Sequence, residues 1–266
     1  MSSVLDITWW QLGLFSCLLV IPLAVNHYHQ LQIGKEIIIS IARMAIQLLL
    51  VGIYLEYLFS LNSLWVNLLW LLIMISVGAS SIVSKAKLPV KILIGPVMIG
   101  LVAGLFPLIF VLCLVIIQPS PWFSAQYMIP LSGMLLGNSL SGNIVALQNL
   151  FTAYKERRSE YEAALSLGAS PFYASRSFVQ NALRKASAPL LASMAATGLV
   201  TLPGMMTGQI LGGTSPLIAI KYQLLIMIAI FVMMNISLTL SVHLSLRAAL
   251  SKEGKVNVRF TDENVH

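Results

Sequence analysis

Charge is the first thing that this sequence lacks. Only 9% of its 266 residues are Asp, Glu, Lys or Arg, whereas 58% are hydrophobic and the mean hydropathy is +0.88. Soluble domains carry about 25% charged residues. The composition therefore excludes a soluble globular protein and predicts an integral membrane protein.

Two further absences narrow the class of protein. The chain has no Gly-x-x-x-x-Gly-Lys-[Ser/Thr] phosphate-binding loop, so we do not expect it to be an ATPase of that class. Its two cysteines, Cys17 and Cys113, both lie in apolar runs. This placement indicates neither a disulfide framework nor a thiolate metal site.

Acidic residues are almost absent from the apolar segments, where Glu56, near the edge of one segment, stands alone. Ion-coupled secondary transporters usually carry acids inside the membrane to move protons or cations. Because these acids are nearly absent, an ion-coupled secondary transporter of a small solute is only the alternative interpretation. No Lys or Arg precedes the first apolar run, so we expect that run to be a retained span and not a cleaved leader.

The apolar segments predict an all-α polytopic membrane protein with about seven transmembrane helices, because a spanning helix needs about 20 apolar residues. We take residues 1–266 as a single transmembrane domain with a tail at 248–266. The predicted spans are 8–26, 37–59, 64–83, 92–117, 127–150, 189–211 and 217–246. The fourth contains Gly95-Pro96 and Pro107, which predict a kink or a break.

The distribution of positive charge predicts the orientation. With the N-terminus outside, all of the 16 Lys and Arg residues except Lys221 fall on the cytoplasmic side. Positive residues accumulate in cytoplasmic loops, so we predict an N-out, C-in topology. The net charge of +7 then reflects topology and anionic lipid, and we expect no nucleic-acid partner.

Residues 152–188, between the fifth and sixth spans, form a charged and amphipathic cytoplasmic segment. Gly168 suits a left-handed helix end, Ser170 a helix cap and Pro171 the first turn of a second helix. The segment is therefore predicted to be a helix-turn-helix. Tyr161, Ala164, Leu165 and Gly168 share one face by spacing, which we expect to meet a partner's groove; the alternative is a loop that lies on lipid headgroups.

Glu162-Ala163-Ala164 followed by Gly168 resembles the EAA motif of ABC-transporter permeases, in which a short cytoplasmic helix docks into an ATP-binding subunit. Where that motif continues with Ile-x-Leu-Pro, this chain has Phe-Val-Gln-Asn at 178–181. The wider chain resembles the FetB family of permeases. The resembling stretches are 43–47, 129–134, 137–138, 165–171, 198–208 (GLVTLPGMMTG) and 219–223 (AIKYQ).

The resemblance implies a non-catalytic permease subunit of an ABC transporter in the bacterial inner (plasma) membrane. It implies a homodimer that binds two copies of a separate ATPase subunit, with ATP and Mg²⁺ held by that partner and no cofactor in this chain. The implied substrate is iron or a related metal ion, and the implied direction is export. The residues implied to couple to the ATPase are Glu162, Ala163, Ala164 and Gly168.

Polar, small or sulfur-bearing residues inside the predicted spans are the candidates for a translocation pathway, since such residues in lipid pack helices or line transport sites. Packing is the commoner role of small residues, and snorkelling to the headgroups is open to an Arg. No metal ligand is assigned. The candidates are Arg43, Gln47, Asn138, Thr201, Pro203, Gly204, Met205 and Met206.

The predicted orientation is tested by labelling single cysteines with an impermeant reagent in intact cells, in a chain whose Cys17 and Cys113 are first replaced by Ala. Ser120→Cys is expected to be labelled and Ser251→Cys to be protected, because the two positions lie on opposite sides of the membrane. Labelling of Ser251→Cys together with protection of Ser120→Cys would reverse the topology.

Overall fold

A computed structural model describes residues 7–251, 254–256, 258 and 260. The described chain is almost entirely helical and contains no strand beyond two isolated bridges, which confirms the predicted fold class. The helical segments are α1 Trp9–Ser16, η1 Cys17–Leu19, α2 Val20–Tyr28, α3 Gly34–Leu61, α4 Leu64–Lys85, α5 Val90–Val111, η2 Leu112–Ile117, α6 Ala125–Glu156, α7 Arg158–Ser166, α8 Pro171–Ala174, α9 Arg176–Ala196, α10 Gly204–Leu211 and α11 Pro216–Ala249.

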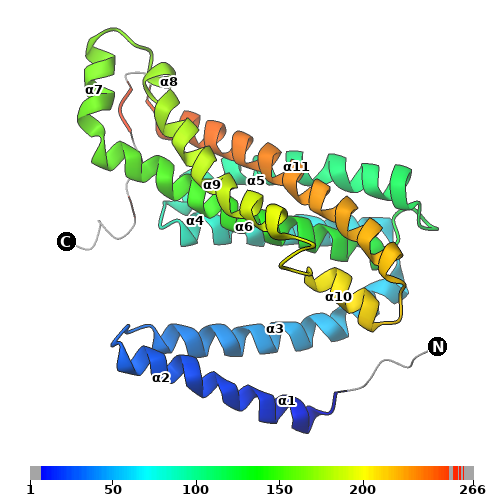
Figure 1. Cartoon of the computed structure of the whole chain (residues 1–266). Coiled ribbons are helices and arrows are strands. Elements are labelled where there is room, and N and C mark those ends of the chain that lie inside the picture. Colours follow the sequence, from blue (N-terminus) through cyan, green and yellow to red (C-terminus); the bar gives the residue numbers. More distant parts are fainter. Residues whose placement is uncertain (1–6, 252–253, 257, 259, 261–266) are drawn as a thin grey trace.

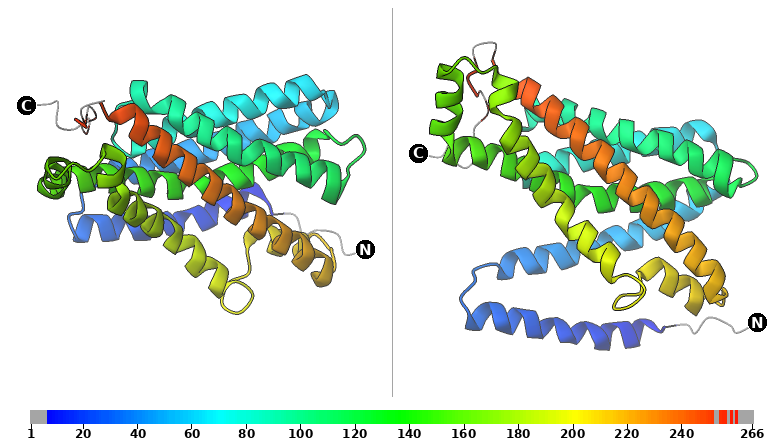
Figure 2. Two further views of the ribbon diagram at one scale, coloured as in Figure 1. Left: turned by 90° about the horizontal axis from the view of Figure 1, so that it is seen from above. Right: turned by 45° about the horizontal axis from the view of Figure 1, so that its top comes forward.

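The long helices run back and forth between two ends of the molecule (Figure 1). α4, α5, α6, α9 and α11 pack into a bundle, whereas α1, η1, α2 and α3 form a hairpin beside it (Figures 1 and 2). Except at the end of α3, where Leu58 is buried, the hairpin helices leave most of their apolar residues exposed, as expected of surfaces that face lipid. Almost all of the buried core lies in the bundle.

Within the described residues, five helical segments are long and apolar enough to cross a membrane: Trp9–Tyr28, Gly34–Leu61, Leu64–Lys85, Val90–Ile117 and Pro216–Ala249. They coincide with five of the seven predicted spans, and the protein is a multi-pass membrane protein. α6 also covers the predicted fifth span, but its polar residues keep it outside this group. In the fourth predicted span, the α-helix continues through Pro96 and Pro107 and changes to a π-helix at Leu112, five residues after Pro107.

The prediction of one continuous span at 189–211 was wrong, because two separate helices cover this stretch. α9 already begins at Arg176 and ends at Ala196, and α10 starts again at Gly204. The chain leaves the helix before Pro203, where Thr197 becomes extended and Gly198 has φ +91°. A short loop with the hydrogen bond Gly198 N–H to Thr201 O, 2.9 Å long, separates the two helices.

The two ends of the bundle differ in the charges of the connections that they hold. The loops between α2 and α3, between α4 and α5 and between α6 and α9 all lie at the end where α11 finishes (Figure 1). These connections and the helix ends beside them carry most of the described Lys and Arg residues, in the arrangement that the charge asymmetry predicts. Lys252 and Arg259, which contribute to that asymmetry, lie outside the described residues.

Two asparagines tie helix ends together at the opposite end of the bundle. Asn62, in the left-handed conformation with φ +38°, ends α3 and accepts a 3.0 Å hydrogen bond from Ala125 N–H at the start of α6. The buried Asn67 of α4 donates to Phe123 O at 2.7 Å. These bonds satisfy backbone groups that a helix end leaves open, and they fix the chain reversal before α6.

The most extensive helix contact joins α5 and α11, and it depends on small residues. A Cβ atom on Gly100 would lie 2.3 Å from Ser241 Oγ and 2.9 Å from Ser237 O. A Cβ atom on Gly104 would lie 3.1 Å from Met233 O. In lipid, where apolar burial gives helices no advantage, such close backbone approach is a main source of association.

Gly100→Ala is expected to lower the thermal stability of the purified protein, because the new methyl group meets the Ser237 carbonyl oxygen of α11. Overpacking of this kind costs about 1–3 kcal/mol. Gly52→Ala is the matched control, since no atom lies within 4 Å of the added Cβ. Thermal unfolding in detergent measures both; equal Tm values for the two variants would contradict the close contact.

Candidate functional site

The predicted helix-turn-helix is present at the end of the bundle where the positive residues gather. α6 runs past the predicted end of its span to Glu156, the backbone bends at Arg157, and α7 leads into α8 and α9 (Figure 1). α6 and α9 are thus continuous from the bundle into this segment. The helix-turn-helix therefore continues directly from two long helices of the bundle and is not a separate loop.

The turn between α7 and α8 has the geometry that its residues predict. Gly168 takes φ +87°, and its N–H donates to Leu165 O at 2.9 Å while Ala169 N–H donates to Ala164 O at 3.0 Å. This pair of bonds is a Schellman motif. Ser170 then caps α8 by accepting from Tyr173 N–H at 3.3 Å, and Pro171 occupies the first turn.

An aromatic cluster fixes α7 to the bundle. Tyr161 of α7 and Phe178 of α9 pack edge-on against Tyr154 of α6, with ring centroids 5.1 and 5.2 Å away. All three side chains are buried. The Tyr154 hydroxyl donates to Ser175 Oγ, and burial raises the pKa of Tyr154 despite that bond, so the phenol is neutral at physiological pH.

This cluster corrects the predicted binding face of α7. Tyr161 is buried, and Leu165 packs partly buried against the core, so neither can enter a partner's groove. The apolar spacing of α7 therefore marks the face that packs on its own chain. Ala164 lies at the boundary and Gly168 is exposed.

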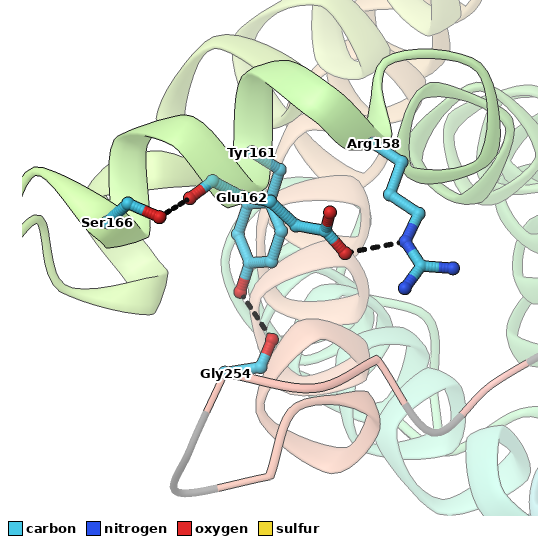
Figure 3. Close-up of polar contacts among 5 residues, drawn as sticks. All are labelled: Arg158, Tyr161, Glu162, Ser166 and Gly254. Atoms are coloured by element: carbon cyan, nitrogen blue, oxygen red, sulfur yellow. Dashed lines mark hydrogen bonds and ion pairs between the residues drawn. The ribbon is translucent and has the colours of Figure 1, made fainter.

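The outward face of α7 carries Glu162, Ala163 and Leu167, all exposed. Leu167 is 90% exposed. Glu162 accepts a 2.6 Å charge-assisted hydrogen bond from Arg158 Nε one turn earlier (Figure 3). Such an exposed pair contributes little stability, but it orients the carboxylate along the helix surface.

Beside this face lies a shallow groove of about 350 Å³ between α7 and the α8–α9 corner. Glu160 and Arg176 place opposite charges on its wall, and Ala164 and Tyr173 add apolar surface. The Arg157 guanidinium hydrogen-bonds Glu160 and lowers the pKa of that carboxyl, so the groove keeps its negative charge. Its shallow shape and mixed lining suit a protein surface better than a small ligand, since ligand pockets are concave and mostly apolar.

The candidate pathway residues occupy three separate places. Arg43 and Gln47 are exposed on α3, and Arg43 has no polar partner among the described residues. Asn138 is exposed on α6 and bonds only its own helix, donating to Met134 O at 2.8 Å. No hydrogen bond between these groups is found in the described part of the chain.

The third place is the interruption between α9 and α10. Thr201 is exposed and forms an isolated bridge with Thr197, while Pro203 caps α10 and accepts from Thr207 N–H at 3.0 Å. Gly204 begins the helix, and Met205 and Met206 are partly buried, with Met205 packed against the core. The described residues hold no group of three His, Cys, Asp or Glu side chains that could bind a metal ion.

A buried polar contact between α6 and α11 was not foreseen. Asn143 Nδ2 donates to Ser139 O at 2.9 Å and to Ser237 Oγ at 3.1 Å, and its Oδ1 atom has no partner. Ser237, Ser241 and Ser245 recur every four residues on the buried face of α11. That spacing was the available signal, because small polar residues four apart mark a helix-packing face in lipid.

The fold and the site together define a multi-pass, all-helical membrane protein with a helix-turn-helix presented beyond one end of its bundle. Residues 9–250 match the family described as "Uncharacterised protein family (UPF0014)". The chain belongs to this family.

Curated relatives cover most of the chain. The "UPF0014 membrane protein slr1647" of Synechocystis sp. is 34% identical over 88% of this chain and 91% of its own. The "Probable iron export permease protein FetB" of Escherichia coli is 31% identical over 91% and 92%. "Protein ALUMINUM SENSITIVE 3" of Arabidopsis thaliana is 36% identical over 80% and 77%. No solved structure matches the chain.

Phe178→Ala is expected to release α7 from the bundle, because truncating a buried Phe costs about 3–5 kcal/mol. Trypsin digestion of the purified protein measures the release as faster cleavage at Arg157 and Arg158. Tyr173→Ala, which truncates an aromatic residue that is 68% exposed, should be cleaved at the wild-type rate. Equal rates for all three proteins would show that the aromatic cluster does not hold α7.

Proposed function

We propose that this chain is the membrane-spanning permease subunit of an ABC transporter, driven by a separate ATP-binding subunit that docks on α7 and α8. The observation that carries the proposal is the outward face of α7, with Glu162, Ala163 and Leu167 exposed beyond the bundle. That face lies at the end where the positive residues predict cytoplasm.

The construction of the segment supports a mechanical role. A docking element must be rigid, because a flexible one absorbs a push without passing it on. α7 is closed by the Schellman motif at Gly168 and held from beneath by Tyr161 and Phe178. Its attachment to both α6 and α9 connects it to two helices of the bundle.

The docking surface combines a charged and an apolar part. The ion pairs Arg157–Glu160 and Arg158–Glu162 supply charged groups. Leu167 with Phe172 and Tyr173 supplies exposed apolar surface at the corner of the segment. An apolar centre within a charged rim is the usual composition of a protein interface. In a homodimer, each chain would present one such surface, and each surface would bind one ATP-binding subunit.

The substrate class comes from the relative whose printed name is a probable iron export permease. We propose iron or a related metal ion as the substrate, export as the direction and the bacterial inner membrane as the location. A metal ion crossing between two protomers would meet oxygen groups, and the interruption at 197–203 presents backbone carbonyls and Thr201. Broken helices commonly line transport sites.

Gly168→Val is expected to weaken binding of the ATP-binding subunit, because a β-branched residue in the left-handed conformation costs about 1–2 kcal/mol and displaces the end of α7. Gly168→Asn is the matched variant and should bind like the wild type, since Asn tolerates φ above zero. No atom lies within 4 Å of a Cβ at this position, so the two variants differ in backbone strain and not in packing.

Co-purification of the tagged permease with the ATP-binding subunit measures docking, and Fe²⁺-dependent ATP hydrolysis in proteoliposomes measures function. Glu162→Lys should act like Gly168→Val because it reverses charge on the docking face. Wild-type docking and hydrolysis in both Gly168→Val and Glu162→Lys would contradict the proposed coupling role.

A further inference from the structure

The chain returns to α7 after its last helix ends. Beyond Ala249, Leu250 pairs with Val256 in an isolated antiparallel bridge. Ser251 N–H donates to Lys255 O at 2.9 Å, and Lys255 N–H donates back to Ser251 Oγ at 3.0 Å. The tail therefore reverses tightly at the end of α11 and does not run away from the bundle.

Gly254 sits at the tip of this reversal, between α7 and α8. Its φ is +80°, and a Cβ atom there would lie 3.0 Å from Leu165 Cδ1 and 3.3 Å from Pro171 Cγ. The Tyr161 hydroxyl donates a 2.9 Å hydrogen bond to Gly254 O (Figure 3). Gly254 is buried, so a side chain there would strain the backbone and press on Leu165 and Pro171.

Two further contacts attach the same helix end to the segment. Val258 is 7% exposed within the main core, and Val256 and Phe260 pack against that core. The Arg247 guanidinium, on the last turn of α11, lies 5.9 Å from the ring centroid of Phe172 in α8, within the range of a cation–π contact. α11 thus touches α7 through the tail and α8 through Arg247.

We propose that the tail, through Gly254, is a clamp that transmits displacement of α7 and α8 to α11. Tyr161 and Gly254 are positioning residues in this device, since neither lies on the outward docking face. α11 packs along α5, α6 and α9 and contacts α10, so a push on it reaches the interruption at 197–203. Coupling between distant sites travels through such contiguous packed elements. This inference rests on the proposed function, in which an ATP-binding subunit moves α7.

The first test measures whether the tail fixes α7 to α11. Spin labels at Ser159→Cys and Ala248→Cys, both exposed positions, in a chain with Cys17 and Cys113 replaced by Ala, report the distance between the two helices. The parent is expected to give one narrow distance and Gly254→Val a broader distribution. Gly198→Val is the control, because Gly198 also has positive φ but no atom within 4 Å of a Cβ.

The second test measures transmission with Tyr161→Phe, which removes one hydroxyl and keeps the buried ring, so that folding is retained. Tyr28→Phe is its matched control, because Tyr28 in α2 is 82% exposed and lies outside the docking surface. With the ATP-binding subunit bound as in the wild type, Tyr161→Phe and Gly254→Val should lower Fe²⁺ transported per ATP hydrolysed by about twofold to thirtyfold, the range for mutations that alter coupling. A residue that only stabilised the fold would lower the yield of protein and leave this ratio unchanged.

The outcomes separate the two proposals. An unchanged distance distribution in Gly254→Val overturns the clamp, and a broadened distribution with an unchanged transport ratio overturns transmission through it. Failure of the wild type to bind an ATP-binding subunit overturns the proposed function and the transmission together. In that case the spin-label distances still decide whether the tail holds α7.

Discussion

The close contact of α5 with α11 is the interaction on which the rest of the structure depends. Gly100 and Gly104 let the two backbones meet, and the serine face of α11 fills the space that the glycines leave. In lipid, where burying leucines gives no net gain between helices, packing of this kind and a few internal hydrogen bonds hold a bundle together. Asn143 adds one such bond between α6 and Ser237. α11 is consequently the helix against which α5, α6 and α9 pack. Its last turn and the tail connect the bundle to the helix-turn-helix.

The helix-turn-helix is also held in place by packing. Here, buried aromatic side chains take the place of close contact between backbones. Tyr154, Tyr161 and Phe178 come from three different helices and leave the opposite face of α7 free. A helix that is fixed by buried contacts on one face and exposed on the other suits the binding of another protein. The described residues hold no group of three His, Cys, Asp or Glu side chains that could bind a metal ion.

Much of the fold could be predicted from the sequence because lipid leaves few choices. A long apolar run must be a helix, since no water is available to satisfy its backbone, and Gly168-Ala169-Ser170-Pro171 specifies its turn through local rules alone. It was harder to predict what each apolar helix face packs against. The apolar positions of α7 indicate that one face is buried, but they do not tell whether a partner or the same chain covers it, and Tyr161 proved to face inward. The break at Thr197 also escaped prediction, because the span at 189–211 was predicted from its length and apolar composition alone.

Contacts between distant parts of the chain lay beyond sequence reasoning altogether. Nothing local in the tail indicates that Gly254 meets Tyr161, and the structure leaves the candidate pathway residues in three separate groups. The central claim, that the outward face of α7 receives an ATP-binding subunit, is tested most directly by placing a photo-crosslinking residue at Leu167 in the complex with that subunit. The account predicts an adduct from Leu167 and none from Leu211, an equally apolar position that is 73% exposed on α10. An adduct from Leu211 with none from Leu167 would contradict it.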